Sequence, residues 1–193
     1  MPFKTKQETW FSQLPFWIRF PFNTWLIIGV LPFLTKRIGF PYLPSSEWVS
    51  QTYIPAIAFG FTTTLFLFVM VHKNIQVKDQ KMTDFKHVLA IFFMPMFGFL
   101  IGYSATVMGA PMIVAATVGS EIEVPFTVVE FDGSSRRCKN PITLDGLPWM
   151  NNMLCGQSKE FRRSLEVNGQ IIVVGRGTAM GVFSHSARKT EPQ

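Results

Sequence analysis

Charged residues are scarce in this chain. Only 16% of its 193 residues are Asp, Glu, Lys or Arg, whereas 48% are hydrophobic. An average soluble chain contains about 25% charged residues, so this chain has too few charged side chains to cover the surface of a soluble globular protein. Its 20 phenylalanines suit contact with lipid better than a small aqueous core. The composition therefore argues against an ordinary soluble domain and favours a membrane protein.

Side chains that carry out chemistry are also few. The chain has 2 cysteines and 3 histidines, with no close-spaced ligand motif such as CxxC or HxxxH. There is no G-x-S-x-G, and Gly175-Arg176-Gly177 lacks the lysine of a phosphate-binding loop. We therefore expect no metal site, no cofactor and no catalytic residues, and we interpret the protein as a non-enzyme. Arg176 remains a candidate for binding an acidic partner.

The positive charge is unevenly distributed. Residues 1–120 hold nine Lys/Arg and four Asp/Glu, whereas residues 121–193 hold nine and eight. The basic excess thus belongs to the apolar part of the chain, as in membrane proteins, which keep Lys and Arg near anionic lipid. No basic stripe marks a folded domain, so we expect no nucleic-acid partner.

Two stretches are long and apolar enough to cross a bilayer. Residues 53–71 carry no charge, and 19–20 residues of helix cross a hydrocarbon core of about 30 Å. The second uncharged stretch, residues 88–120, is too long for one crossing. We predict a span over 88–107, a helix stop at Gly109 and Pro111, and an interfacial linker over 108–120.

Residues 1–52 allow two interpretations. They contain 12 aromatic residues and six prolines. They could form interfacial segments with basic groups reaching the headgroups, or one short transmembrane helix over 22–34 and its neighbours. The sequence predicts two or three transmembrane helices in total.

Lysines indicate the orientation. The loop over residues 72–87 contains four lysines, and no basic residue occurs between Val107 and Arg136. By the positive-inside rule the loop is cytoplasmic and the chain after Val107 lies outside. We expect a bacterial inner-membrane protein with a periplasmic C-terminal domain.

Small residues recur every four positions in both predicted spans. Such faces let two helix backbones approach closely. We expect them to mediate helix–helix contact, either between the two spans or with another subunit. The residues are Ala56, Gly60 and Thr64 in the first span, and Gly98, Gly102 and Thr106 in the second.

The C-terminal part has the features of a small all-β domain. Residues 121–131 are rich in β-branched and aromatic residues, Asn168-Gly169 predicts a tight turn, and two short strands follow. We predict a barrel- or sandwich-like domain over residues 121–186, of the OB- or SH3-like kind, and a flexible tail over 187–193.

Both cysteines fall in this domain. Cys138 and Cys155 are 17 positions apart, on the side that the orientation makes oxidising. Small domains with thin cores are commonly cross-linked, so a disulfide is expected.

Three functional hypotheses follow. The leading one is a non-enzymatic accessory or scaffold subunit of a membrane assembly. Its partners would be the lipid bilayer and other membrane subunits, or further copies of itself. The second is a redox or metal-handling envelope protein that uses Cys138 and Cys155. The third is a small membrane enzyme or transport component at the lipid interface, with Arg19, Lys36 or Arg37 on a lipid phosphate.

Overall fold

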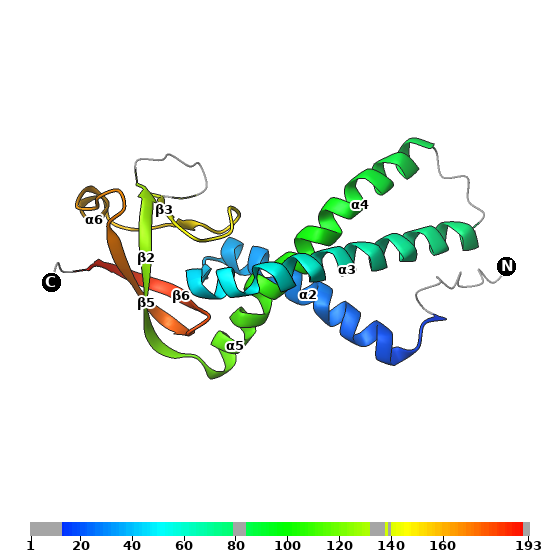
Figure 1. Ribbon diagram of the computed structural model, residues 1–193, viewed down its shortest axis with the longest axis horizontal. Helices are drawn as coiled ribbons and strands as arrows, with labels where there is room; N and C mark the ends of the chain where they lie inside the picture. Colours follow the sequence, from blue (N-terminus) through cyan, green and yellow to red (C-terminus); the bar gives the residue numbers. More distant parts are fainter. Residues whose placement is uncertain (1–12, 79–83, 132–137, 139, 191–193) are drawn as a thin grey trace, which may run out of the picture.

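The chain folds into a helical part and a β-sheet part at opposite ends of an elongated molecule (Figure 1). This computed structural model describes residues 13–78, 84–131, 138 and 140–190. The described N-terminal end and the ends of α3 and α4 that flank residues 79–83 lie far from the sheet, whereas the last described residues follow directly on its final strand.

Three helices are long and apolar enough to span a membrane. They are α2 (Phe16–Ile38), the portion Ser46–Lys73 of α3 (Ser46–Lys78), and the stretch Phe92–Val118, which begins within α4 (Asp84–Ser104). The 23 residues of α2 extend roughly 35 Å at 1.5 Å per residue, enough for a core of about 30 Å. The described part of this N-terminal region is therefore one helix that is long and apolar enough to be a third span.

The predicted stop at Gly109 and Pro111 is wrong. The backbone passes from α4 through a π-helical turn, η1 (Ala105–Gly109), directly into α5 (Ala110–Val118). Gly109 keeps a helical backbone, with φ −66° and ψ −50°. Pro111 has no N–H to donate within the continuous helix, and the Val107 carbonyl four residues before it accepts from the Trp48 indole N–H. Residues 110–118 are therefore helical, and the helix ends where Gly119 becomes extended.

The sheet is a curled antiparallel half-barrel with the strand order β1-β6-β5-β2-β3-β4. Five of its strands come from the C-terminal part: β2 (Ser120–Glu130), β3 (Ile142–Leu144), β4 (Met153–Leu154), β5 (Gln170–Thr178) and β6 (Gly181–Lys189). The helix α6 (Lys159–Arg163) occupies the segment between β4 and β5. Because β6 reaches Lys189, the predicted flexible tail is wrong for residues 187–189, which are held by pairing with β5.

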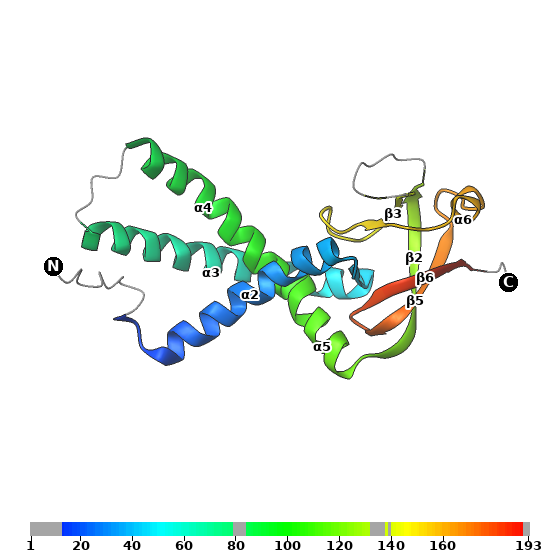
Figure 2. The same cartoon turned by 180° about the vertical axis from the view of Figure 1, so that it is seen from behind.

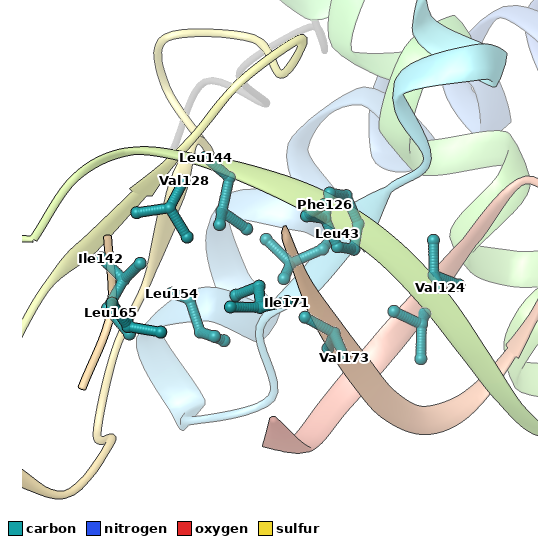
Figure 3. Close-up of a cluster of buried hydrophobic side chains, with 11 residues drawn as sticks. Leu43, Val124, Phe126, Val128, Ile142, Leu144, Leu154, Leu165, Ile171 and Val173 are labelled. Carbon is teal, nitrogen blue, oxygen red and sulfur yellow. The ribbon is translucent and has the colours of Figure 1, made fainter. Parts of the chain in front are cut away.

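The sixth strand comes from the N-terminal part of the chain. β1 (Tyr42–Pro44) lies in the connection between α2 and α3 and pairs with Gly181–Phe183 of β6. Its Leu43 is fully buried in the apolar cluster that fills the curled sheet (Figure 3). The predicted domain boundary at residue 121 therefore left out one strand and one core residue of the β domain.

Hydrogen bonds and apolar contacts fix the sheet to the helices. The Ser45 hydroxyl donates to the Ala179 carbonyl at 2.9 Å, which joins the start of α3 to the turn before β6. The Trp48 indole N–H donates to the Val107 carbonyl at 3.2 Å, which joins the same end of α3 to η1. Tyr42 packs with Met112 and Ala115 of α5. Figure 2, seen from behind, shows α5 leading from the helices to β2. We call this set of contacts the mount.

Tyr42 provides a test of the mount. Its hydroxyl is buried and has no hydrogen-bond partner in the described part of the chain. Tyr42→Phe removes an unsatisfied polar atom, so we expect unchanged or slightly higher stability, by up to about 1 kcal/mol. Tyr42→Ala should lower the free energy of unfolding by roughly 3–5 kcal/mol, because it leaves a cavity. Thermal and denaturant unfolding of the detergent-solubilised variants measure both effects.

The same residue predicts a pH dependence. Burial raises the pKa of the Tyr42 hydroxyl, so the folded state resists ionisation at a pH where the unfolded chain ionises. The stability from this group is present below an unfolded tyrosine pKa of about 10 and declines as the pH rises above it. Tyr42→Phe should remove that part of the alkaline decline. An unchanged alkaline profile in this variant would contradict the assignment.

Candidate functional site

The predicted small-residue faces of α3 and α4 lie against each other. A Cβ atom built on Gly98 would lie 2.9 Å from the Thr64 Cα, and one on Gly102 would lie 2.9 Å from the Gly60 Cα. The Thr64 hydroxyl lies 3.1 Å from the Pro95 carbonyl and 3.0 Å from that of Gly60, so it can donate to either helix. Four of the six residues thus form one close helix contact.

The other two residues of the faces lie nearer the sheet. Ala56 is fully buried and packs with Val107 and Met108 of the π-helical turn. Thr106 lies in that turn, where its hydroxyl donates to the Gly102 carbonyl at 3.2 Å.

Two further glycines bring α2 to the same crossing. A Cβ on Gly29 would lie 2.4 Å from the Ile101 carbonyl oxygen, and one on Gly109 would lie 2.3 Å from that of Ile28. Sequence reasoning missed Gly29 and assigned Gly109 to a helix stop, because neither residue belongs to a four-residue repeat. The available signal was a lone glycine within an apolar helical stretch, which commonly has a packing reason.

Cys138 and Cys155 form a disulfide, with an S–S distance of 2.07 Å and a Cα–Cα distance of 5.2 Å. The bond joins the residue four positions before β3 to the residue directly after β4, so it closes the loop around the β3–β4 hairpin. Both sulfurs are therefore engaged with each other rather than available as thiolates.

Arg176 was singled out by sequence as a candidate for binding an acidic partner. Arg176 is exposed on β5, and its Nε donates to the Gly119 carbonyl at 3.1 Å, at the junction of α5 and β2. His185 lies on β6 with its Nε2 3.6 Å from a Glu121 carboxylate oxygen, and both side chains are exposed. Within the described ranges, no three His, Cys, Asp or Glu side chains are grouped so that they could hold a metal ion.

The loop lysines used for orientation are described only in part. Lys73 is exposed near the end of α3 that is distant from the sheet. Lys81 lies outside the described residues, and Lys78 and Lys86 are described by their backbone alone. Arg19, in the first turns of α2, lies at the opposite end of that helix from Lys36 and Arg37, so the three basic residues do not form one site.

A cavity with polar and aromatic walls lies between the end of α2 and the β3–β4 hairpin. It has a volume of about 810 Å³, and we call it the interface pocket. Its lining residues are Phe33, Lys36 and Arg37 from α2, the disulfide between Cys138 and Cys155, and Trp149, Met150, Asn152 and Met153 from the hairpin.

Lys36 and Arg37 bring positive charge to this pocket. The Lys36 ammonium donates to the Met150 carbonyl at 2.8 Å, which fixes the helix end to the hairpin loop. Both residues lie in the last turn of α2, where cations complement the helix dipole. The ion pairs seen among the described residues use Glu121, Glu123 and Glu166, all outside the pocket lining, so no described carboxylate neutralises Lys36 or Arg37.

The loop between β3 and β4, which forms one wall of the pocket, is also bound to β1. The Asn151 amide donates to the Tyr42 carbonyl, which ties the loop to β1, and Asn151 is buried. The adjacent Asn152 has a buried side-chain oxygen without a hydrogen-bond partner in the described part of the chain. Sequence reasoning named Lys36 and Arg37 but missed Trp149 and Asn152, because only the tertiary fold brings that loop to the helix end.

These features define a class: three crossing helices, each long and apolar enough to span a membrane, joined to an antiparallel half-barrel. Comparisons with protein-family models, with curated proteins and with solved structures found no match to this chain.

Proposed function

We propose that this protein is a non-enzymatic accessory subunit of a larger membrane assembly. In this proposal the helices span the bacterial inner membrane, and the β domain lies on the periplasmic side. The observation that carries the proposal is the mount. β1, which lies between α2 and α3, is part of the sheet. The Ser45 hydroxyl bonds to the turn before β6, and the Trp48 indole bonds to η1.

A domain held at several points cannot swing independently of its helices. Such a fixed position suits a protein that sets the location of a partner, whereas a substrate-gating lid needs freedom to move. The glycine contacts between α2, α3 and α4 fix the other side of the mount in the same way.

The partner surface is expected among the apolar helix faces. α2 and α3 flank an aromatic groove of about 390 Å³, lined by Trp17, Ile18, Pro21, Phe22, Trp25, Phe59, Thr62, Thr63 and Phe66. The Trp25 indole N–H donates to the Thr63 hydroxyl at 3.2 Å and so links α2 to α3 at this groove. None of the lining residues is charged. An apolar helix of another subunit could pack there.

The test is purification in mild detergent followed by native mass spectrometry. We expect a stoichiometric complex with at least one different membrane protein. The double variant Ser45→Ala with Trp48→Phe removes both mount hydrogen bonds but keeps most of the apolar contact, and recovery of the complex should fall at least threefold.

Ser50→Ala is the matched control. It removes one exposed hydrogen bond within α3, from the Ser50 hydroxyl to the Glu47 carbonyl, and should leave the complex intact. Recovery of the wild-type chain as a monomer, or only as a homo-oligomer, would refute the accessory role. Equal recovery of the complex with the double variant would refute the importance of the mount.

A further inference from the structure

The interface pocket lies where a membrane-spanning α2 would leave the hydrocarbon. α2 ends at Gly39, whose φ of 95° stops the helix, and the sheet begins three residues later. Large apolar side chains near this end are exposed: Ile38 by 71%, Phe40 by 64% and Trp149 by 76%. Exposed aromatic residues beside basic ones are typical of the headgroup layer.

The charge in the pocket suits an anion. Lys36 uses one donor on the Met150 carbonyl, so two of its three N–H donors are left. Arg37 is exposed and has a planar fork of donors that matches a phosphate. Asn152 also lines the pocket, and its side-chain amide carries two N–H donors.

The walls suit more than a bare ion. Phe33 and Met153 are exposed along the pocket, and Trp149 adds an aromatic face. A volume of about 810 Å³ lies within the range of roughly 300–1,000 Å³ found for organic ligands. A phosphate that carries a glycerol and acyl chains would place its charge on the cations and its apolar part against Phe33.

We propose that the interface pocket binds the phosphate group of an anionic phospholipid, with Lys36 and Arg37 as its cationic ligands and Trp149 and Phe33 against the lipid glycerol and acyl chains. The site would fix the height of the β domain relative to the headgroups. It does not depend on the accessory role, because a chain purified alone would still bind the lipid.

The test is lipid titration of the full-length protein in detergent, followed by native mass spectrometry. We expect phosphatidylglycerol to bind at least tenfold more tightly than phosphatidylcholine. Lys36→Gln with Arg37→Gln should reduce phosphatidylglycerol affinity at least tenfold. Lys159→Gln with Arg163→Gln removes the same charge from α6 and is the matched control, for which we expect less than a twofold change.

Lys36 also holds the hairpin loop, so its loss could unfold the site. Arg37→Gln alone avoids this problem, because Arg37 makes no side-chain hydrogen bond or ion pair among the described residues. This variant should lose at least threefold in affinity with an unchanged melting temperature, and Arg37→Lys should recover part of it. Equal binding of both lipids, or equal losses in the pocket and control variants, would overturn the proposal.

A competition arm distinguishes a lipid from a free phosphate. Inorganic phosphate in the millimolar range should displace less than a tenth of bound phosphatidylglycerol, since it lacks the apolar part. If inorganic phosphate displaces the lipid completely, the pocket is a phosphate site and the lipid assignment is wrong.

Discussion

Gly102→Leu is expected to prevent the helices from assembling. A Cβ atom at this position would lie 2.6 Å from the Thr63 Oγ1, 2.7 Å from the Phe59 carbonyl oxygen and 2.9 Å from the Gly60 Cα. Two of these three atoms belong to backbone and cannot rotate away. The helices would have to separate, which should cost at least about 3 kcal/mol, beyond the range of ordinary overpacking.

Detergent extraction with size-exclusion chromatography measures this effect. We expect Gly102→Leu to give less than a fifth of the wild-type yield of monodisperse protein. Leu100→Ile, two residues away in the same helix, conserves volume and should behave like the wild type. Gly102→Ala should be intermediate, because its single methyl group already meets the same atoms. Wild-type yield and melting temperature for Gly102→Leu would show that α3 and α4 do not make this contact.

Loss of the disulfide is expected to destabilise the β domain strongly. The bond closes a loop of 17 residues, which stabilises a fold by roughly 3 kcal/mol through the reduced entropy of the unfolded chain. The core that it supports is a single cluster inside one curled sheet. Cys138→Ala with Cys155→Ala should therefore lower the melting temperature of the β domain by at least about 10 °C.

Intact mass with alkylation, before and after reduction, tests the cysteines directly. In freshly isolated protein we expect alkylation only after reduction, and reduced wild type should melt like the double variant. The helical signal in far-ultraviolet circular dichroism should be retained, since the disulfide lies outside the helices. Free thiols, or a stoichiometric metal, would instead support the redox or metal-handling hypothesis and would count against an oxidising compartment.

The local features of this protein could be predicted from sequence wherever the signal was short-range. Long uncharged stretches identified the apolar helices, since exposing so many apolar side chains to water would be unfavourable. Asn168 adopts the left-handed backbone, with a φ of 64°, that the Asn-Gly pair indicated. The pairing of Cys138 with Cys155 followed because the chain has two cysteines.

Only the tertiary structure determined how these parts are joined. β1 has three residues and ends in proline, so it has no strand pattern of its own and exists because β6 pairs with it. The helix continues through Gly109 because that residue packs against the Ile28 carbonyl of α2, a contact between residues far apart in sequence.

The interface pocket shows the same division. The basic pair Lys36 and Arg37 is visible in the sequence as a charge at the end of an apolar stretch. The pocket forms where the loop between β3 and β4 meets the end of α2, and the Lys36 ammonium there reaches the Met150 carbonyl, 114 residues further along the chain. Sequence alone determined the composition of the helices, the turns and the cross-link, because these depend on neighbouring residues or on residue counts. The mount and the pocket depend on packing between residues far apart in sequence, so only the tertiary structure, in which the sheet packs against the helices, determines them.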